Sequence, residues 1–140
     1  MVIRLIPIFE KTAFTMKYDQ IDNKLFIKNR KKFMAQMRPK SIAVFNSNDI
    51  YPVSADSTLP FEQHRDILYL SGIDQEESIL LMFPDSIDEK HREVLFVRET
   101  NDHIAVWEGA KLDKKQATGV SGIETIYWLS EFEKVFFYHL

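Results

Sequence analysis

Apolar residues recur at helical spacing over residues 22–37, where Phe26, Phe33 and Met37 lie along one stripe. The range opens on residues of the type that cap helices, and it closes just before Pro39. A proline disfavours the α region for the residue that precedes it. The pattern therefore predicts one amphipathic helix that ends before Pro39.

Three short apolar runs with β-branched or aromatic residues predict buried strands: Ser41–Phe45, Ser78–Phe83 and Glu93–Val97. The charged turn between the second and third runs is short, so we expect these two strands to be hairpin neighbours. By contrast, residues 46–57 are rich in Asn, Asp and Ser and contain Pro52. They predict a loop.

The remaining segments continue an alternation of helices and strands. Residues 66–70 form either a short helix or a strand, ended by Gly72, and residues 101–112 are less regular. Apolar positions between Trp128 and Phe136 return to helical spacing. This order of elements predicts an α/β domain in which helices flank a mixed β-sheet.

Composition excludes several classes of partner. A length of 140 residues fits one domain, and a formal net charge of −3 gives no reason to expect nucleic acid. No apolar run reaches the about 20 residues that a membrane span needs, so we expect no membrane partner. Cysteine is absent, which fits a reducing compartment, and we predict a cytoplasmic protein. Because Met16 precedes the first helical pattern, we interpret residues 1–15 as a tail or an upstream start.

A search for chemistry assigns no catalytic residue and no metal ligand. The four histidines form no H-E-x-x-H pattern, and the chain has no G-x-S-x-G, P-loop or G-x-G-x-x-G motif. Ser121 lies one residue away from a nucleophile pattern, and we do not expect it to act as one. His64 and Asp66 form an H-x-D pair, which local hydrogen bonding explains better than a metal site.

Trp107 stands in an irregular segment beside a glycine, and two roles remain open for it. It caps the core, or it forms a flat apolar wall for a ligand or partner, as large aromatic residues do at interfaces.

Several short motifs follow one another in a recognisable order: Ser54-Ala55-Asp56-Ser57, Pro60-Phe61-Glu62-Gln63, Asp66–Gly72, Leu95-Phe96-Val97-Arg98 and Trp107-Glu108-Gly109. In this order, the chain from about Tyr18 onward resembles the N-terminal domain of Xaa-Pro aminopeptidases and prolidases. Some positions depart from that family's pattern. Glu62 stands where the family usually has Arg, His64-Arg65 replaces an Asn-Ser-like pair, Ile67 replaces Phe, and Lys111 replaces Arg.

The resemblance implies that residues 16–140 form a creatinase-like, ribonuclease-H-like N-terminal domain. The "pita-bread" catalytic domain that follows in the family is absent from this chain. That domain holds two divalent metals, typically manganese, which activate water to hydrolyse the bond before a proline. We therefore expect this chain alone to be inactive and to bind no cofactor.

The resemblance also implies partners and site residues. In the family the N-terminal domain shapes the substrate cleft and supports homo-oligomers. Carried over, Asp56 would pair with an arginine of the protein's own C-terminal catalytic domain, and Trp107 would wall the pocket for the Xaa-Pro peptide. The motifs lean toward aminopeptidase rather than dipeptidase. Two other readings stay open: a stand-alone peptide-binding module without catalysis, and a dimerisation domain only.

Overall fold

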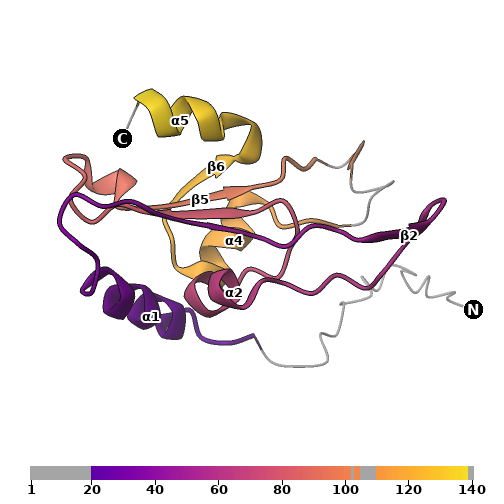
Figure 1. The fold of residues 1–140 in the computed structure, drawn as a ribbon, viewed down its shortest axis with the longest axis horizontal. Helices are drawn as coiled ribbons and strands as arrows, with labels where there is room; N and C mark the ends of the chain where they lie inside the picture. Colours follow the sequence, from indigo (N-terminus) through magenta and orange to yellow (C-terminus); the bar gives the residue numbers. More distant parts are fainter. Residues whose placement is uncertain (1–19, 102, 105–109, 139–140) are drawn as a thin grey trace, which may run out of the picture.

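The computed structural model of the chain describes residues 20–101, 103–104 and 110–138. In this part of the chain, a four-stranded mixed sheet lies between two helical layers (Figure 1). The strands stand in the order β1 (Ala43–Asn46), β4 (Ile79–Met82), β5 (Glu93–Val97) and β6 (Thr125–Trp128). The predicted α/β fold with a mixed sheet flanked by helices is thereby confirmed.

The sheet is mixed because its last connection is a crossover. β1, β4 and β5 pair antiparallel in turn, with Val44 opposite Leu81 and Leu81 opposite Val94. β6 then pairs parallel to β5, with Leu95 opposite Ile126. Helix α4 (Lys114–Ser121) makes the return between these two parallel strands, as parallel pairing requires.

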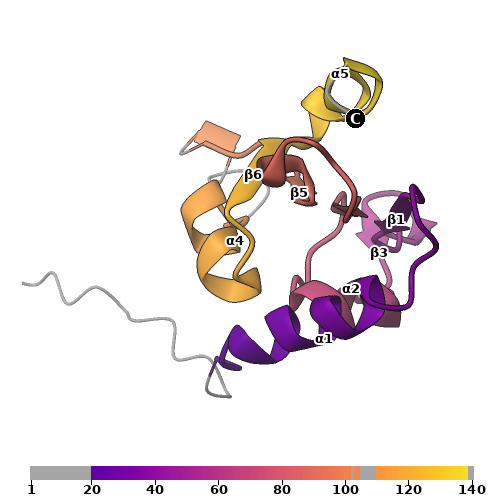
Figure 2. The same cartoon turned by 90° about the vertical axis from the view of Figure 1, so that its left-hand side faces the viewer.

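One face of the sheet is covered by α1 (Lys24–Met34), α2 (Arg65–Ser71) and α4 (Figure 2). The core on this side consists of apolar residues from β4, β5, β6, α2, α4 and the turns that follow these two helices: Ile67, Leu70, Ile73, Leu80, Met82, Leu95, Val97, Ala117, Ile123 and Ile126. The opposite face is covered by the short 3₁₀ turn η2 (Leu129–Glu131) and α5 (Phe132–Tyr138), and its core holds Leu81, Val94, Phe96 and Val135. β5 is buried on both faces, which explains its continuous apolar run.

Two helices on the first face end in the same three residues. Ser71-Gly72-Ile73 closes α2 and Ser121-Gly122-Ile123 closes α4. In each case, the serine hydroxyl donates to a carbonyl one turn back at 2.7 Å, and it accepts from the isoleucine N–H at 3.1 Å. Both glycines adopt the left-handed conformation that such a helix end needs.

Arg30 joins these two helix ends to the sheet. Its side chain is fully buried, and Nη1 donates to the carbonyls of Leu70 at 2.8 Å and Ser121 at 2.9 Å. Its Nε donates to Glu93 at the start of β5 at 3.0 Å. A cation beside two helix C-termini is favourably placed, because those ends carry partial negative charge. α1 is therefore fixed by one arginine over α2, α4 and β5.

Several predicted boundaries require correction. The first helix ends at Met34, three residues before the predicted end, and residues 66–70 lie in a helix rather than a strand. The predicted loop at 46–57 contains the hairpin of β2 (Pro52–Ser54) and β3 (Ser57–Thr58). The helix predicted from Trp128 starts later, because Trp128 ends β6.

Three further elements were not predicted. α4 and β6 lie in residues that carry no strong apolar period, and the charged turn before β5 contains a short 3₁₀ helix, η1 (Glu89–His91). Among the described residues, no helix is both long enough and apolar enough to cross a membrane.

Candidate functional site

The segments that contain the candidate residues Asp56 and Trp107 both start from the same end of the sheet. The C-terminal ends of β1, β5 and β6 and the start of β4 lie at this end, because β4 alone runs in the opposite direction. The β2–β3 hairpin leaves from it after β1, and the segment that begins at Arg98 leaves from it after β5 (Figure 1). The hairpin that carries Asp56 and the segment that contains Trp107 therefore both begin at this end of the sheet.

The hairpin carries Asp56 at its tip. Ser54 pairs with Ser57 across the two-residue turn formed by Ala55 and Asp56. Ala55 has φ of +46°, in the left-handed region that a tight hairpin turn requires and that a non-glycine residue seldom adopts. Asp56 is exposed and makes no hydrogen bond or ion pair to any described residue. Its carboxylate is available for a partner outside this part of the chain.

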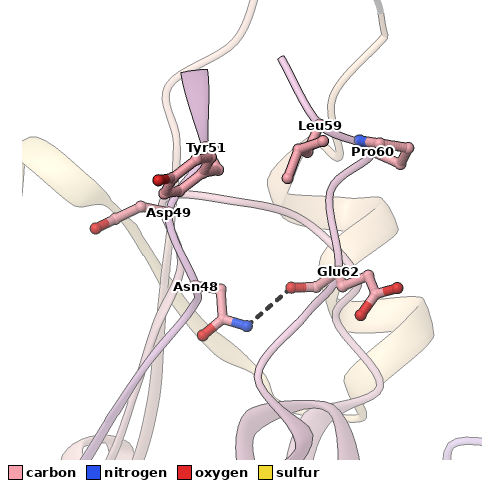
Figure 3. Close-up of a pocket in the computed structure, with 6 residues that line it drawn as sticks. All are labelled: Asn48, Asp49, Tyr51, Leu59, Pro60 and Glu62. Carbon is pink, nitrogen blue, oxygen red and sulfur yellow. Dashed lines mark hydrogen bonds between the residues drawn. The ribbon is translucent and has the colours of Figure 1, made fainter. Parts of the chain in front are cut away.

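A shallow hollow of about 610 Å³ lies at the base of the hairpin (Figure 3). Six residues line it: Asn48, Asp49, Tyr51, Leu59, Pro60 and Glu62. Tyr51 and Leu59 come from the two arms, and the Asn48 amide donates to the Glu62 carbonyl at 2.9 Å across its floor. Leu59 N–H also donates to the Tyr51 carbonyl at 3.0 Å. These two bonds join the arms where the hairpin meets the body of the domain.

Gln63 anchors this base to the core. Its side chain is buried, and Oε1 accepts from the N–H groups of Asn48 at 3.2 Å and His64 at 2.8 Å. Its Nε2 donates to the carbonyls of Ile73 at 3.0 Å and Gln75 at 2.8 Å. Gln63 therefore uses both ends of its amide to tie the hairpin to the turn that precedes β4.

The same turn holds both flanks of the segment that contains Trp107. Gln75 Oε1 accepts from Leu112 N–H at 2.8 Å, and the Glu76 carboxylate pairs with Lys111. Arg98, directly after β5, lies 3.7 Å from Glu76 and 3.0 Å from Glu77. The hairpin and the flanks of residues 99–110 are thus tied to one short turn, residues 73–77.

Glu76 keeps its charge although it is buried. Burial acts to raise the pKa of its carboxyl, and this is the largest single influence. The hydrogen bond from Lys111, a backbone hydrogen bond, and the charges of Lys111 and Arg98 act in the opposite direction and together hold the pKa below its ordinary value. The turn is therefore held by an ionised carboxylate.

The structure places some predicted residues and not others. Asp56 lies at the hairpin tip, whereas Trp107 lies outside the described residues, so its two possible roles stay predictions. His64 Nδ1 accepts from Asp66 N–H at 3.3 Å and caps α2, which agrees with the expected local hydrogen bonding. The Ser121 hydroxyl is fully buried and donates to the Ala117 carbonyl, so it cannot serve as a nucleophile.

Sequence reasoning missed the residues that build this edge. No sequence pattern singles out Gln75 or Glu76, yet both are buried in the structure. In the sequence, Gln63 is only one member of the motif 60–63, and Lys111 is only a departure from the family's pattern. A Gln that follows a Pro-aromatic pair at the end of a loop was the available signal, because a buried amide can satisfy several backbone groups at once.

No group of three or more His, Asp or Glu side chains in residues 20–101, 103–104 and 110–138 is arranged to hold a metal ion. The described residues therefore do not fit a metal centre.

Comparisons with known proteins agree with this fold. The family model described as "Aminopeptidase P, N-terminal domain" matches residues 26–140. Human Xaa-Pro aminopeptidase 3 is 28% identical over 113 residues, which cover 79% of this chain and 22% of that protein. Escherichia coli Xaa-Pro aminopeptidase is 29% identical over 112 residues, which cover 80% of this chain and 25% of that protein.

Solved structures give the same result. The Pseudomonas aeruginosa aminopeptidase PepP matches with a TM-score of 0.76 and 26% identity, over 84% of this chain and 26% of that one. A zinc-substituted Escherichia coli aminopeptidase P in complex with product matches with a TM-score of 0.75 and 27% identity, over 87% of this chain and 28% of that one. This chain thus spans about a quarter of the length of the proteins it matches. The chain belongs to the family of aminopeptidase P N-terminal domains.

Proposed function

We propose that this chain is the non-catalytic N-terminal domain of an Xaa-Pro aminopeptidase, a metallopeptidase that removes the N-terminal residue before a proline. The catalytic domain and its two divalent metals, with manganese as the expected metal, belong to the part of the relatives that this chain does not match. The domain shapes the substrate cleft, and it supports a homo-oligomer in the cytoplasm.

The observation that carries this proposal is Asp56, which has no hydrogen-bond or ion-pair partner among the described residues. Its carboxylate stands at the tip of a hairpin whose base is fixed by Gln63, so the hairpin presents a charge at a defined distance from the core. A carboxylate in this position is suited to a charge-assisted bond with an arginine of the catalytic domain. Trp107 belongs to a segment whose two flanks are tied to the same turn, residues 73–77, as the hairpin is. This shared attachment supports a role for Asp56 and Trp107 in one substrate cleft.

The first test is the intact mass of the native gene product in its source cells. A product several times larger than 140 residues supports the proposal, because the catalytic domain would then follow in the same polypeptide. A native product of 140 residues would contradict it and would favour a stand-alone peptide-binding or dimerisation module. The isolated chain, supplied with manganese, should release no N-terminal residue from an Xaa-Pro peptide.

The second test uses the native-length protein with Asp56→Asn, which keeps the shape and removes the charge. We expect kcat/KM for an Xaa-Pro peptide to fall about 10- to 100-fold, the effect of one lost hydrogen bond to a charged group. Glu124→Gln is the matched control, because Glu124 is also exposed and lies just before β6, away from the hairpin. Equal kcat/KM values for both variants and the parent would argue against a role for Asp56.

The third test addresses Trp107 in the same native-length protein. Trp107→Ala should raise KM for the peptide more than it lowers kcat, since a pocket wall contributes mainly to binding. A change in stability with unchanged KM would instead support the other reading, in which Trp107 caps the core.

A further inference from the structure

The hollow at the base of the β2–β3 hairpin presents apolar surface that the described part of the chain leaves open. Tyr51 and Leu59 are 68% and 52% exposed, and their side chains face each other from the two arms (Figure 3). Pro60 continues this surface beside Leu59. Large side chains left open to solvent around a concave surface are typical of a place that binds a ligand or a partner.

The backbone around the hollow is fixed by the fold itself. The Asn48 amide bonds to the Glu62 carbonyl across the floor, and Leu59 N–H bonds to the Tyr51 carbonyl between the arms. The buried amide of Gln63, next to the floor, is bonded to the turn that precedes β4. A ligand therefore does not have to order these walls, which lowers the entropic cost of binding.

Two carboxylates give the hollow a negative charge. Asp49 and Glu62 are both exposed, and their side chains lie on opposite sides of the hollow (Figure 3). None of the six lining residues is Lys, Arg or His. Within residues 20–101, 103–104 and 110–138, neither carboxylate forms an ion pair. The negative charge of the hollow is therefore available to a cation from another molecule.

Glu62 makes this charge a feature of the present chain. In the family pattern that the chain resembles, Arg usually stands at this position, directly after the Pro-aromatic pair. An arginine there would balance Asp49 and would repel a second cation. Glu62 reverses the charge at that position, so both charged residues of the hollow are negative.

We propose that the hollow binds the side chain of an arginine or a lysine in an extended peptide. The aliphatic stem of that side chain packs against Tyr51, Leu59 and Pro60, because such stems cover apolar surface while their charged end stays in contact with water. The charged end lies beside the Tyr51 ring and one of the two carboxylates, which both attract a cation. This site goes beyond the proposed function, since binding there requires neither a catalytic domain nor Trp107.

An NMR titration of the isotope-labelled chain of 140 residues tests the proposal. The probe is the blocked peptide acetyl-Ala-Ala-Arg-Ala-Ala-amide, and its matched control carries citrulline, which keeps the shape of arginine without the charge. The arginine peptide should shift the backbone amides of Asn48, Tyr51 and Glu62, and it should bind about fivefold more tightly than the citrulline peptide. This preference should shrink in about 0.5 M salt, because the carboxylates are exposed. Equal affinities for the two peptides, no binding, or shifts confined to other parts of the chain would overturn the proposal.

A pair of variants gives an independent readout. Glu62→Arg introduces the residue of the family pattern and should abolish the preference for the arginine peptide. Glu124→Gln removes a charge from an exposed residue just before β6, at the other end of the sheet, and should keep the full preference. Unchanged amide shifts outside the hollow establish that each variant is folded, and Glu62→Gln replaces E62R if that variant is not. A preference that persists without Glu62, or that Glu124→Gln removes equally, would mean that the hollow is not the binding site.

Discussion

The two ends of β5 carry two ionic centres that differ in burial and in purpose. At its start, Glu93 pairs with Arg30, whose side chain is fully buried beneath three helices. Beyond its end, Arg98 joins Glu76, Glu77 and Lys111, and Arg98 and Glu77 remain partly in contact with solvent. The first centre holds elements of the core together. The second holds the flanks of the segment that contains Trp107.

The difference follows from solvation. Burial lowers the pKa of the Arg30 guanidinium, and the charge of Glu93 and its hydrogen bond act in the opposite direction. The fully buried guanidinium of Arg30 depends on every one of its bonds, because a lost partner leaves an unsolvated charge. A partly exposed network tolerates loss better, since water replaces a missing partner. We therefore expect the loss of Arg30 at the start of β5 to destabilise the whole domain. We expect the loss of Glu76, near the end of β5, to destabilise only the segments attached there.

The largest effect is expected for Arg30→Met. This change leaves Glu93 and two helix-end carbonyls without their donor, and it should lower the free energy of unfolding by about 3–5 kcal/mol. Denaturant unfolding of the 140-residue chain measures it. Lys28→Met, on the exposed side of the same helix, is the control and should stay within about 0.5 kcal/mol. A decrease in the free energy of unfolding below about 1 kcal/mol for R30M would contradict a stabilising role for the buried Arg30.

The next effect tests the helix ends that Arg30 joins. A Cβ at Gly72 would lie 2.3 Å from the Phe26 ring, and φ is +72° there. Gly72→Ala should therefore lower the free energy of unfolding by about 1–2 kcal/mol because of the backbone conformation and by about 1–3 kcal/mol because of crowding. Gly119→Ala lies within α4 with open space around it, and it should stabilise by about 0.5–1 kcal/mol. Similar thermal midpoints for the two variants would refute the close approach of α1 to Gly72.

A smaller effect is expected for Glu76→Gln, which should lower the free energy of unfolding by about 1–2 kcal/mol. The loss is limited because Lys111 and Arg98 keep partial access to water. The pKa of Glu76 is lowered in the folded state, so its ionic stabilisation is complete above the ordinary carboxyl pKa of about 4.3. It is lost as the pH falls through the lower folded-state value.

Unfolding measured from pH 7 down to pH 2 tests this dependence. The difference in stability between the parent and E76Q should shrink in the acid range, while Glu124→Gln should follow the parent throughout. A difference between the parent and E76Q that stays constant with pH would contradict an ionised Glu76.

The smallest effect on stability is expected at the hairpin tip. Asp56→Asn removes no contact with the described residues, so the free energy of unfolding of the 140-residue chain should change by less than about 0.5 kcal/mol. Combined with the expected loss of activity in the native-length protein, this result would separate function from folding at one residue. A loss above about 1 kcal/mol would instead mean that Asp56 stabilises the hairpin.

Local sequence patterns predict much of the architecture. Apolar periodicity predicts the three antiparallel strands, the first helix and the α/β class. Pro39 and Gly72 mark the ends of helices, because Pro39 follows α1 and Gly72 closes α2. The family follows from ordered motifs. These features depend on residues close together in the chain, so the sequence alone is sufficient to predict them.

Contacts between distant residues decided the rest. α4 presents only Ala117 and Ser121 as buried residues, so no apolar stripe announces it, and β6 becomes a strand by pairing with β5. Arg30 stands in the basic stretch 28–32, which carries no sign of a buried residue, yet it bonds to residues 40, 63 and 91 positions away. Gln63, Gln75 and Glu76 likewise acquire their partners only in the folded chain. A polar side chain is stable in the interior only when its partners arrive from other elements, and no local pattern records which elements those will be.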